Sequence, residues 1–428
     1  MELFDREEGL SRAEIEAMQE SRLRETLRLA GKTPFYAKRL AETGPIKKVA
    51  DLSRLPFTTK DDLRAHYPYG LLATERDNIV RMHASSGTTG SPTAIHYTRE
   101  DIDTWARLMA RCMHMVGIRP RDVFQNTSGY GLFTGGLGIH FGAEYLGCLT
   151  IPAGAGNTRR QLKLIQDFGV TVIHIIPSYA LYMGETLQQD RIAPDSFPVK
   201  IALIGAEPHT EEARQRIEFL LGCRCYNSYG LSEMNGPGVA FECTEQNGLH
   251  VWEDAYIFEI VDRHDQSPLE AGQWGELVMT TLTRQGMPVL RYRTGDITRL
   301  IAGDCACGRR HRRIDRIAGR VDDMFILKGV NIYPLQIERV LMSFPEVGQN
   351  YVIELDNQQG KDILKVRVEV GENSSAGDND LQKAVTRMLK DEILLTPQVE
   401  LVSFGGLPKA EGKAVRLIDK RRTTPAIN

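Results

Sequence analysis

Residues 83–93 form a run of small hydroxyl residues and glycines whose types and spacing could bind phosphate. Glycine allows tightly turned backbone, so successive N–H groups can point at one anion, and the small hydroxyls add further donors. Residues 78–82 precede the run and predict a short strand, which places the loop at a strand end. No Gly-Lys-Ser/Thr follows the glycines, so this is not a Walker motif. Taken alone, the run is equally typical of a solvated surface loop.

Two other polar segments follow apolar runs of strand length. Residues 170–176 and 200–204 are continuous apolar stretches, a pattern typical of buried parallel strands in an α/β sheet. Ligands bind such sheets outside the carboxyl ends of the strands. Residues 205–208 follow one strand and residues 226–233 follow the next. The latter place an aromatic ring, a turn glycine, a hydroxyl and a carboxylate close together, which favours a ligand site over a structural turn.

Residues 129–136, Gly-Tyr-Gly-Leu-Phe-Thr-Gly-Gly, interleave four glycines with two aromatic rings. They could line a flat apolar slot, because glycine lets a planar ligand approach the backbone while Tyr130 and Phe133 pack on its face. The alternative is a helix N-terminus packed tightly against a sheet.

Residues 85–93 resemble the phosphate loop of the adenylate-forming acyl-CoA synthetases, and their surroundings resemble one branch, the phenylacetate-CoA ligases. That branch usually carries Lys where this chain has Ser91, so one phosphate-directed cation is replaced. The resemblance assigns binding of ATP or AMP to Ser85, Ser86, Gly87, Thr88, Thr89, Gly90, Gly205, Ala206, Glu207, Pro208, Tyr229, Gly230, Ser232, Asp296 and Arg320. It assigns the aryl substrate to Tyr130, Phe133, Gly135 and Gly136.

The implied reaction is AMP-forming acid–thiol ligation, with ATP, Mg²⁺ and coenzyme A. A free carboxylate is a poor acyl donor, and joining it to AMP supplies a leaving group; catalysis is then mostly positioning and charge neutralisation. By the resemblance, Glu233 would hold magnesium, and Asp296 would accept both ribose hydroxyls. Lys413 would reach the nucleotide during the first step, and rotation of the small domain about Asp322 would withdraw it for the second.

Two other functions stay open at this point. The first is a related ligase that acts on another aryl acid, or passes the acyl group to an acceptor other than CoA. The second is a nucleotide-binding regulatory protein without catalysis, which the presence of Glu233, Asp296 and Lys413 disfavours. An assay of AMP formation separates the two.

Four further residues are not required by nucleotide chemistry: Cys243, His250, Cys305 and Cys307. A Cys₃His set suits a closed structural zinc site. A competing Cys₄ set would combine Cys223 and Cys225 with Cys305 and Cys307. It is disfavoured because Cys223 and Cys225 are two residues apart on a predicted buried strand, where cysteine is a common core residue. Unconnected free thiols are the third alternative.

The bulk properties limit the partners. With 428 residues and a formal net charge of −3, the chain gives no electrostatic case for nucleic acid. It has no apolar run of the roughly 20 residues that span a bilayer, and no signal-peptide pattern. Seven cysteines, an odd number, fit a reduced compartment, so we expect a cytoplasmic enzyme without membrane or nucleic-acid partners. A homodimer is left open.

The expected architecture is α/β: a large N-terminal adenylate-forming domain over residues 1–321, with mixed or parallel sheets, and a small mobile α+β domain over residues 322–428. The elements predicted by periodicity, capping and apolar runs are listed next. Helices are predicted at 11–31, 100–116, 334–343 and 379–392, and a further capped helix is predicted to begin within 58–63. Strands are predicted at 121–127, 350–355, 363–370 and 399–403.

Overall fold

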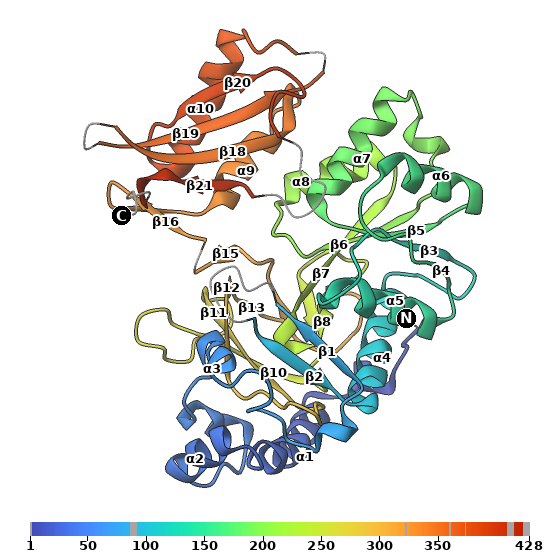
Figure 1. The fold of residues 1–428 in the computed structure, drawn as a ribbon, viewed down its shortest axis with the longest axis vertical. Coiled ribbons are helices and arrows are strands. Elements are labelled where there is room, and N and C mark those ends of the chain that lie inside the picture. Colours follow the sequence, from blue (N-terminus) through green and yellow to red (C-terminus); the bar gives the residue numbers. More distant parts are fainter. Residues whose placement is uncertain are drawn as a thin grey trace. The chain divides into compact units, whose positions relative to one another are not determined.

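The computed structural model describes residues 2–85, 92–321, 323–358, 361–372, 374–408 and 415–422. By their internal contacts they form two compact units (Figure 1). The first comprises residues 1–174, 201–206 and 226–317, and the second comprises residues 175–200, 207–225 and 318–428. The sequence-based domain boundary at residues 321 and 322 remains a prediction.

The first unit is built on a mixed nine-stranded sheet of order β13-β14-β9-β8-β7-β6-β5-β3-β4. Strand β3 pairs in parallel with β4 and β5, whereas β8 pairs antiparallel with β7 and β9. This confirms the expected mixed α/β class. The strands lying wholly or mostly in this unit are β1 (Arg81–Ala84), β2 (Ala94–Tyr97), β3 (Val123–Asn126), β4 (Leu149–Ile151), β5 (Val172–Ile175), β6 (Ile201–Gly205), β7 (Arg224–Leu231), β8 (Gly236–Glu242), β9 (Leu249–Val251), β10 (Tyr256–Val261), β11 (Gly275–Thr281), β12 (Tyr292–Thr298), β13 (Leu300–Ile301) and β14 (Arg313–Ile314).

Helices α4 and α5 pack against each other and against β8 (Figure 1). Two glycines of α5 allow this close packing: a Cβ at Gly138 would lie 2.1 Å from Trp105, and one at Gly142 would lie 2.5 Å from Met109. The helices of this unit are α1 (Arg12–Ala30), α2 (Pro34–Thr43), α3 (Lys60–Ala65), α4 (Arg99–Met115), α5 (Thr134–Leu146) and α6 (Thr158–Phe168). The predicted capping boxes open α1 and α3, at Ser11 and Thr59.

The second unit contains a four-stranded sheet of order β20-β19-β18-β21. Helix α10 buries Leu381, Val385 and Leu389 in its core, one residue per turn, as its amphipathic pattern predicted. Its helices are α7 (Pro177–Gln189), α8 (Glu211–Leu221), α9 (Pro334–Met342) and α10 (Asn379–Ile393). Its strands are β15 (Gly319–Arg320), β16 (Phe325–Leu327), β17 (Val330–Ile332), β18 (Val347–Gln358), β19 (Lys361–Val370), β20 (Gln398–Val402) and β21 (Leu417–Asp419).

Two local predictions were wrong. The strand expected at residues 78–82 begins later, as β1, because Arg76–Asn78 form a 3-10 turn. Gly230, expected in a turn, lies inside β7, and a Cβ there would lie 1.7 Å from the carbonyl oxygen of Gly236. Close approach of β8, rather than a positive φ, therefore requires this glycine. Among the described residues, none of the helices has the length and apolarity needed to cross a bilayer.

Candidate active site

The hydroxyl-rich run connects the two strands of an antiparallel hairpin, β1 and β2, in which Ala84 faces Ala94. At its base the Ser85 and Thr93 hydroxyls lie 2.6 Å apart. The carbonyl oxygen of Leu132 accepts from the Ala84 N–H at 2.9 Å and from His83 Nδ1 at 3.0 Å. The base of the predicted phosphate loop therefore lies beside the glycine-rich segment. Ser86, Gly87, Thr88, Thr89, Gly90 and Ser91 lie outside the described residues.

The glycine-rich segment 129–136 leads into α5, which begins at Thr134. Gly136 is required by packing, because a Cβ there would lie 2.3 Å from the Gly129 carbonyl oxygen, whereas nothing lies within 4 Å of one at Gly135. The backbone of this segment is therefore a helix start packed tightly against its neighbours, which was the alternative to a flat apolar slot. Phe133 is 55% exposed, so its ring is available to a ligand.

Tyr130 is fixed by two neighbours that the sequence analysis missed. Its hydroxyl accepts from Asn126 Nδ2 at 3.1 Å and lies 3.2 Å from His140 Nδ1, whose ring meets the Tyr130 ring edge to face. Burial raises the Tyr130 pKa, so the hydroxyl stays protonated near neutrality. His140 follows Gly135 and Gly136 of α5 by about one helical turn, so helical periodicity could have predicted that it lies beside this segment.

Thr134 and Ser232 bring the glycine-rich segment to the second polar motif, with their hydroxyls 3.3 Å apart. Ser232 follows β7 in a short 3-10 turn that also carries Glu233. Glu233 is only 6% exposed and forms no ion pair with any residue that the structure describes. A buried carboxylate is costly unless a cation or hydrogen bonds compensate it, so Glu233 has the chemistry of a metal ligand.

The Tyr229 hydroxyl donates to Asp296 Oδ2 at 2.6 Å, and both side chains are buried. Tyr229 lies on β7 and Asp296 on β12, so the bond joins the predicted adenine and ribose motifs. The neighbouring Thr294 hydroxyl accepts from the Asp296 N–H at 3.0 Å. The first bond fixes one oxygen of the carboxylate, and the second fixes the backbone of Asp296.

The chain turns at residues 205–208, where β6 ends. A Cβ at Gly205 would lie 2.3 Å from the Ser228 carbonyl oxygen, and Ala206 has a φ of 68°, a conformation rare for a residue with a side chain. The Glu207 carboxylate accepts from the N–H and the hydroxyl of Ser178, both at 3.0 Å, at the start of α7. Strained backbone held by such contacts is typical of ligand-binding positions.

The second unit contains a cavity of about 350 Å³ that several motif residues line. Glu207 and Pro208 line it together with Arg320, Asp323 and Tyr333. Tyr351 and Glu338 also line it. The Tyr351 hydroxyl donates to Glu338 at 2.7 Å, and burial raises the pKa of the Glu338 carboxyl. Arg320 therefore lies with Glu207 and Pro208 around one space, and the nucleotide-binding role of these residues stays a prediction.

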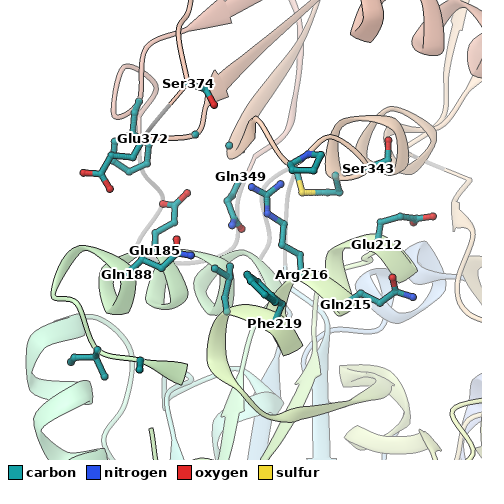
Figure 2. Close-up of a pocket in the computed structure, with 18 of the residues that line it drawn as sticks. Glu185, Gln188, Glu212, Gln215, Arg216, Phe219, Ser343, Gln349, Glu372 and Ser374 are labelled. Carbon is teal, nitrogen blue, oxygen red and sulfur yellow. The ribbon is translucent and has the colours of Figure 1, made fainter. Parts of the chain in front are cut away.

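A larger cavity of about 1030 Å³ in the same unit is lined by α7, α8 and the chain near residues 343–374 (Figure 2). Both acidic and basic residues line it. One of them, Arg216, donates a hydrogen bond to the carbonyl oxygen of Val347 at 2.6 Å. None of the predicted site residues lines it. The predicted site residues of the second unit that line a cavity, Glu207, Pro208 and Arg320, line the smaller one.

Lys413 and Asp322 lie outside the described residues. Their assignments as the mobile catalytic lysine and the pivot therefore stay predictions from the sequence.

The structure brings Cys243, His250, Cys305 and Cys307 into one buried cluster whose potential ligand atoms all lie within 4.8 Å of one another. The competing set with Cys223 and Cys225 is not found among the described residues. Hydrogen bonding from Cys243 holds the pKa of Cys307 well below the usual thiol range, and the same contact raises the pKa of Cys243.

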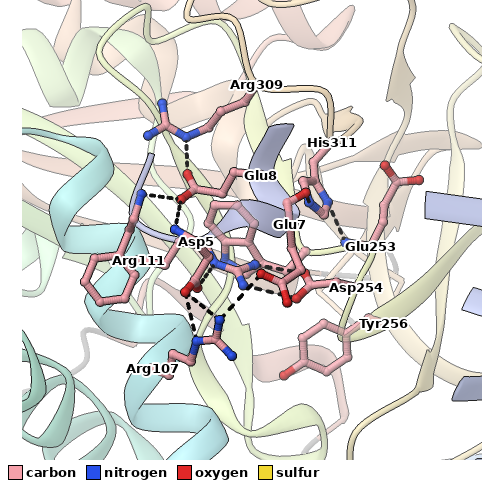
Figure 3. A network of polar contacts seen from close by, with 12 residues as sticks. Asp5, Glu7, Glu8, Arg107, Arg111, Glu253, Asp254, Tyr256, Arg309 and His311 are labelled. Carbon is pink, nitrogen blue, oxygen red and sulfur yellow. Dashed lines mark hydrogen bonds and ion pairs between the residues drawn. The ribbon is translucent and has the colours of Figure 1, made fainter. Parts of the chain in front are cut away.

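A buried ionic network joins the N-terminal segment to α4, to the chain after β9 and, through Arg309, to the turn that carries Cys305 and Cys307 (Figure 3). Arg111 donates to Asp5 at 2.7 Å and to both oxygens of Asp254, at 2.9 and 3.1 Å. Arg309 pairs with Glu8, and both are buried. This network is structural, because none of its members belongs to the phosphate, adenine or ribose motifs.

The chain is similar to known proteins over most of its length. The model of the AMP-binding enzyme family matches residues 13–283, and that of the AMP-binding enzyme C-terminal domain matches residues 329–421. The chain is 42% identical to the phenylacetate-coenzyme A ligase of Thermus thermophilus, over 97% of this chain and 98% of that one. It is 41% identical to the phenylacetate-coenzyme A ligase of Escherichia coli, over 96% of each. A crystal structure of 2-hydroxyisobutyryl-CoA ligase in the postadenylation state, in complex with 2-HIB-AMP, superimposes with a TM-score of 0.91 at 28% identity, covering 97% of this chain and 92% of that one.

Proposed function

Because the chain belongs to the AMP-binding enzyme family, in its phenylacetate-CoA ligase branch, we propose that it joins an arylacetic acid to coenzyme A through an acyl-adenylate. The observation that carries the proposal is the bond between Tyr229 and Asp296, which unites the adenine and ribose motifs in one buried arrangement.

In the first step, a carboxylate oxygen of the acid attacks the α-phosphorus of ATP, and the bond from that phosphorus to the bridging oxygen breaks to release pyrophosphate. Asp296 would accept the two ribose hydroxyls, and the backbone of residues 205–208 would face adenine. The N–H groups and hydroxyls of residues 85–90 would hold the outer phosphates. These contacts position the nucleotide, which is the main source of catalysis in such a step.

Mg²⁺ suits this site because the available donors are hard oxygens. The Glu233 carboxylate is buried without an ion-pair partner among the described residues, and the preceding residue, Ser232, has its hydroxyl 3.3 Å from that of Thr134. When bound, the ion would neutralise charge on the phosphates. Glu233 would hold it, and Lys413 would add a second positive charge during adenylation.

In the second step, the thiol sulfur of coenzyme A attacks the acyl carbon, AMP leaves, and a thioester forms. The lysine assigned to the first step is then not required. Rotation about Asp322 would remove it, so that one site could serve both half-reactions.

An aryl side chain is proposed because the acyl segment offers flat rings and small residues. Tyr130 is held by Asn126 and His140, Phe133 is exposed, and Gly135 leaves open space beside the helix start. A planar ring can stack on such a surface, whereas a long flexible chain gains little from it. None of the seven cysteines, all of which lie in the described residues, forms a disulfide, which supports a cytoplasmic location.

The test is exchange of labelled pyrophosphate into ATP, measured with and without coenzyme A. We expect phenylacetate to support exchange without CoA, and net AMP formation to need CoA. Release of AMP and pyrophosphate without consumption of CoA would instead identify the related ligase that uses another acceptor. Absence of any acid-dependent exchange would contradict the proposal.

A further inference from the structure

A buried cluster of three cysteines and one histidine lies in the first unit, apart from the residues assigned to the reaction. Cys243 follows β8, His250 lies on β9, and Cys305 and Cys307 lie in the turn between β13 and β14. The strands bring these turns together, because β9 pairs with both β8 and β14. The cluster therefore does not depend on the nucleotide motifs.

The distances have the size of a tetrahedral metal site. The Cys243 and Cys305 sulfurs lie 3.7 Å apart, and the Cys307 sulfur lies 3.2 Å from His250 Nε2. With metal–sulfur bonds of about 2.3 Å and metal–nitrogen bonds of about 2.0 Å, the edges of such a tetrahedron are about 3.5–3.8 Å, so the sulfur–sulfur distance matches and the sulfur–nitrogen distance is slightly short. A disulfide, whose sulfurs lie about 2.05 Å apart, is not formed.

The histidine is oriented as a metal ligand. Its Nδ1 lies 3.2 Å from the carbonyl oxygen of His311, to which an Nδ1–H donates, so Nε2 carries the lone pair that faces the sulfurs. A ring nitrogen fixed by a backbone carbonyl in this way is the usual second contact of a metal-binding histidine.

We propose that Cys243, His250, Cys305 and Cys307 hold one structural zinc ion, which fixes the turn 302–312 so that this turn can bind the N-terminal segment. All four protein ligands are present and the cluster is buried, so no position is left for a substrate, as in closed structural sites. Three thiolates and one imidazole select zinc over the hard cations that the phosphates would bring.

The turn 302–312 contains Arg309 and His311, which contact the N-terminal segment. Arg309 pairs with Glu8, and His311 Nε2 donates to the Glu7 carbonyl oxygen at 3.0 Å (Figure 3). His311 Nδ1 in turn accepts from the Glu253 N–H at 3.0 Å. Because Cys307 is two residues from Arg309 and four from His311, loss of the ion would loosen both contacts.

The first measurement is the metal content of the untagged full-length protein, purified without chelator. We expect about one zinc per chain, released by an organomercurial that blocks thiolates. Cys305→Ser should lose the zinc and lower the Tm. The control is Cys148→Ser, since Cys148 is 8% exposed against 7% for Cys305 and lies outside the cluster. Cys225→Ser should also keep the metal, which distinguishes the proposed set from the competing one.

The second measurement does not depend on a variant that folds. Wild-type protein in which cobalt replaces zinc should show the visible absorption of a tetrahedral cobalt–thiolate centre. On removal of metal, hydrogen exchange should rise in residues 2–12 and in the turn 302–312, while α10 keeps its protection. Protein without metal that keeps the same Tm and the same N-terminal protection would overturn the proposal, as would iron in place of zinc, or equal zinc in Cys305→Ser and Cys148→Ser.

Discussion

The Tyr229 hydroxyl donates a 2.6 Å hydrogen bond to Asp296 Oδ2, joining side chains that are 67 residues apart in the chain. One strand delivers the ring expected beside adenine, and another delivers the carboxylate expected on the ribose. The bond aligns the carboxylate before the nucleotide binds, which lowers the entropic cost of binding.

Tyr229→Phe removes this bond and keeps the ring. A hydrogen bond to a charged group contributes about 1.5–3 kcal/mol, so kcat/KM for ATP should fall by about 10- to 100-fold. Steady-state kinetics with varied ATP checks this. The control is Tyr145→Phe, an exposed tyrosine outside the motifs, which should leave kcat/KM unchanged. An unchanged value in Tyr229→Phe would show that the bond does not serve nucleotide binding.

Gly135 and Gly136 offer a matched pair. Gly136→Ala should destabilise the protein by about 1–3 kcal/mol, because the new methyl group meets the Gly129 carbonyl oxygen. Gly135→Ala meets nothing and should keep or slightly raise the Tm, while it raises KM for the aryl acid by partly filling the slot. Thermal unfolding and acid kinetics measure both. If Gly135→Ala leaves KM for the acid unchanged, Gly135 does not line the substrate site.

Lys413→Ala should slow adenylation by at least about 100-fold, the usual cost of removing one charge-stabilising group from a transition state. It should leave formation of the thioester from supplied acyl-adenylate largely intact, since the lysine serves the first conformation alone. Separate assays of the two half-reactions check this, with Lys383→Ala, an exposed lysine of α10, as the control. Equal loss in both half-reactions would contradict the proposed role.

Asp322→Pro should act differently, by restricting φ at the predicted pivot. We expect both half-reactions to survive in isolation and the overall turnover to fall. Single-turnover kinetics distinguish these outcomes, and an unchanged overall rate would place the pivot elsewhere.

The buried pair of Arg111 and Asp254 predicts a dependence of stability on acid. Burial alone would raise the Asp254 pKa, but Arg111 outweighs it and lowers the pKa to about 2. The unfolded value is about 3.9, so this carboxylate contributes stability that is fully present above about pH 4 and is lost as the pH falls through about 2. Asp254→Asn should lower the free energy of unfolding at neutral pH by about 3–5 kcal/mol and flatten this part of the acid profile.

Chemical denaturation at several pH values measures both effects. Asp61→Asn, whose side chain is exposed, is the control and should keep the wild-type profile. An acid profile in Asp254→Asn as steep as that of the wild type would contradict the pKa assigned to this residue.

Much of the fold followed from local patterns. The buried strands β5 and β6, the capped helices α1 and α3 and the α+β elements after Pro334 lie where periodicity and capping predicted them. Such patterns act over a few residues, so the sequence shows them directly. The start of β1 was missed because the 3-10 turn at Arg76–Asn78 overlaps the predicted strand at Asn78.

The partners of the site residues were harder to predict, because they are distant in the chain. The contact of Thr134 with Ser232 spans 98 residues, and that of Arg309 with Glu8 spans 301. Gly230 was predicted in a turn because glycine permits positive φ, but close approach of β8 requires it instead. The four residues proposed to bind zinc were chosen by residue type, and the pairing of β9 with β8 and β14 brings them together.

The most direct test of the proposed function is the formation of AMP and CoA thioester by the purified protein with different acids. With ATP, Mg²⁺ and coenzyme A present, we predict that phenylacetate or a related small aryl acid gives equal amounts of AMP and acyl-CoA, at a higher kcat/KM than any long-chain fatty acid. Comparable activity with long-chain acids and none with arylacetates would contradict the account.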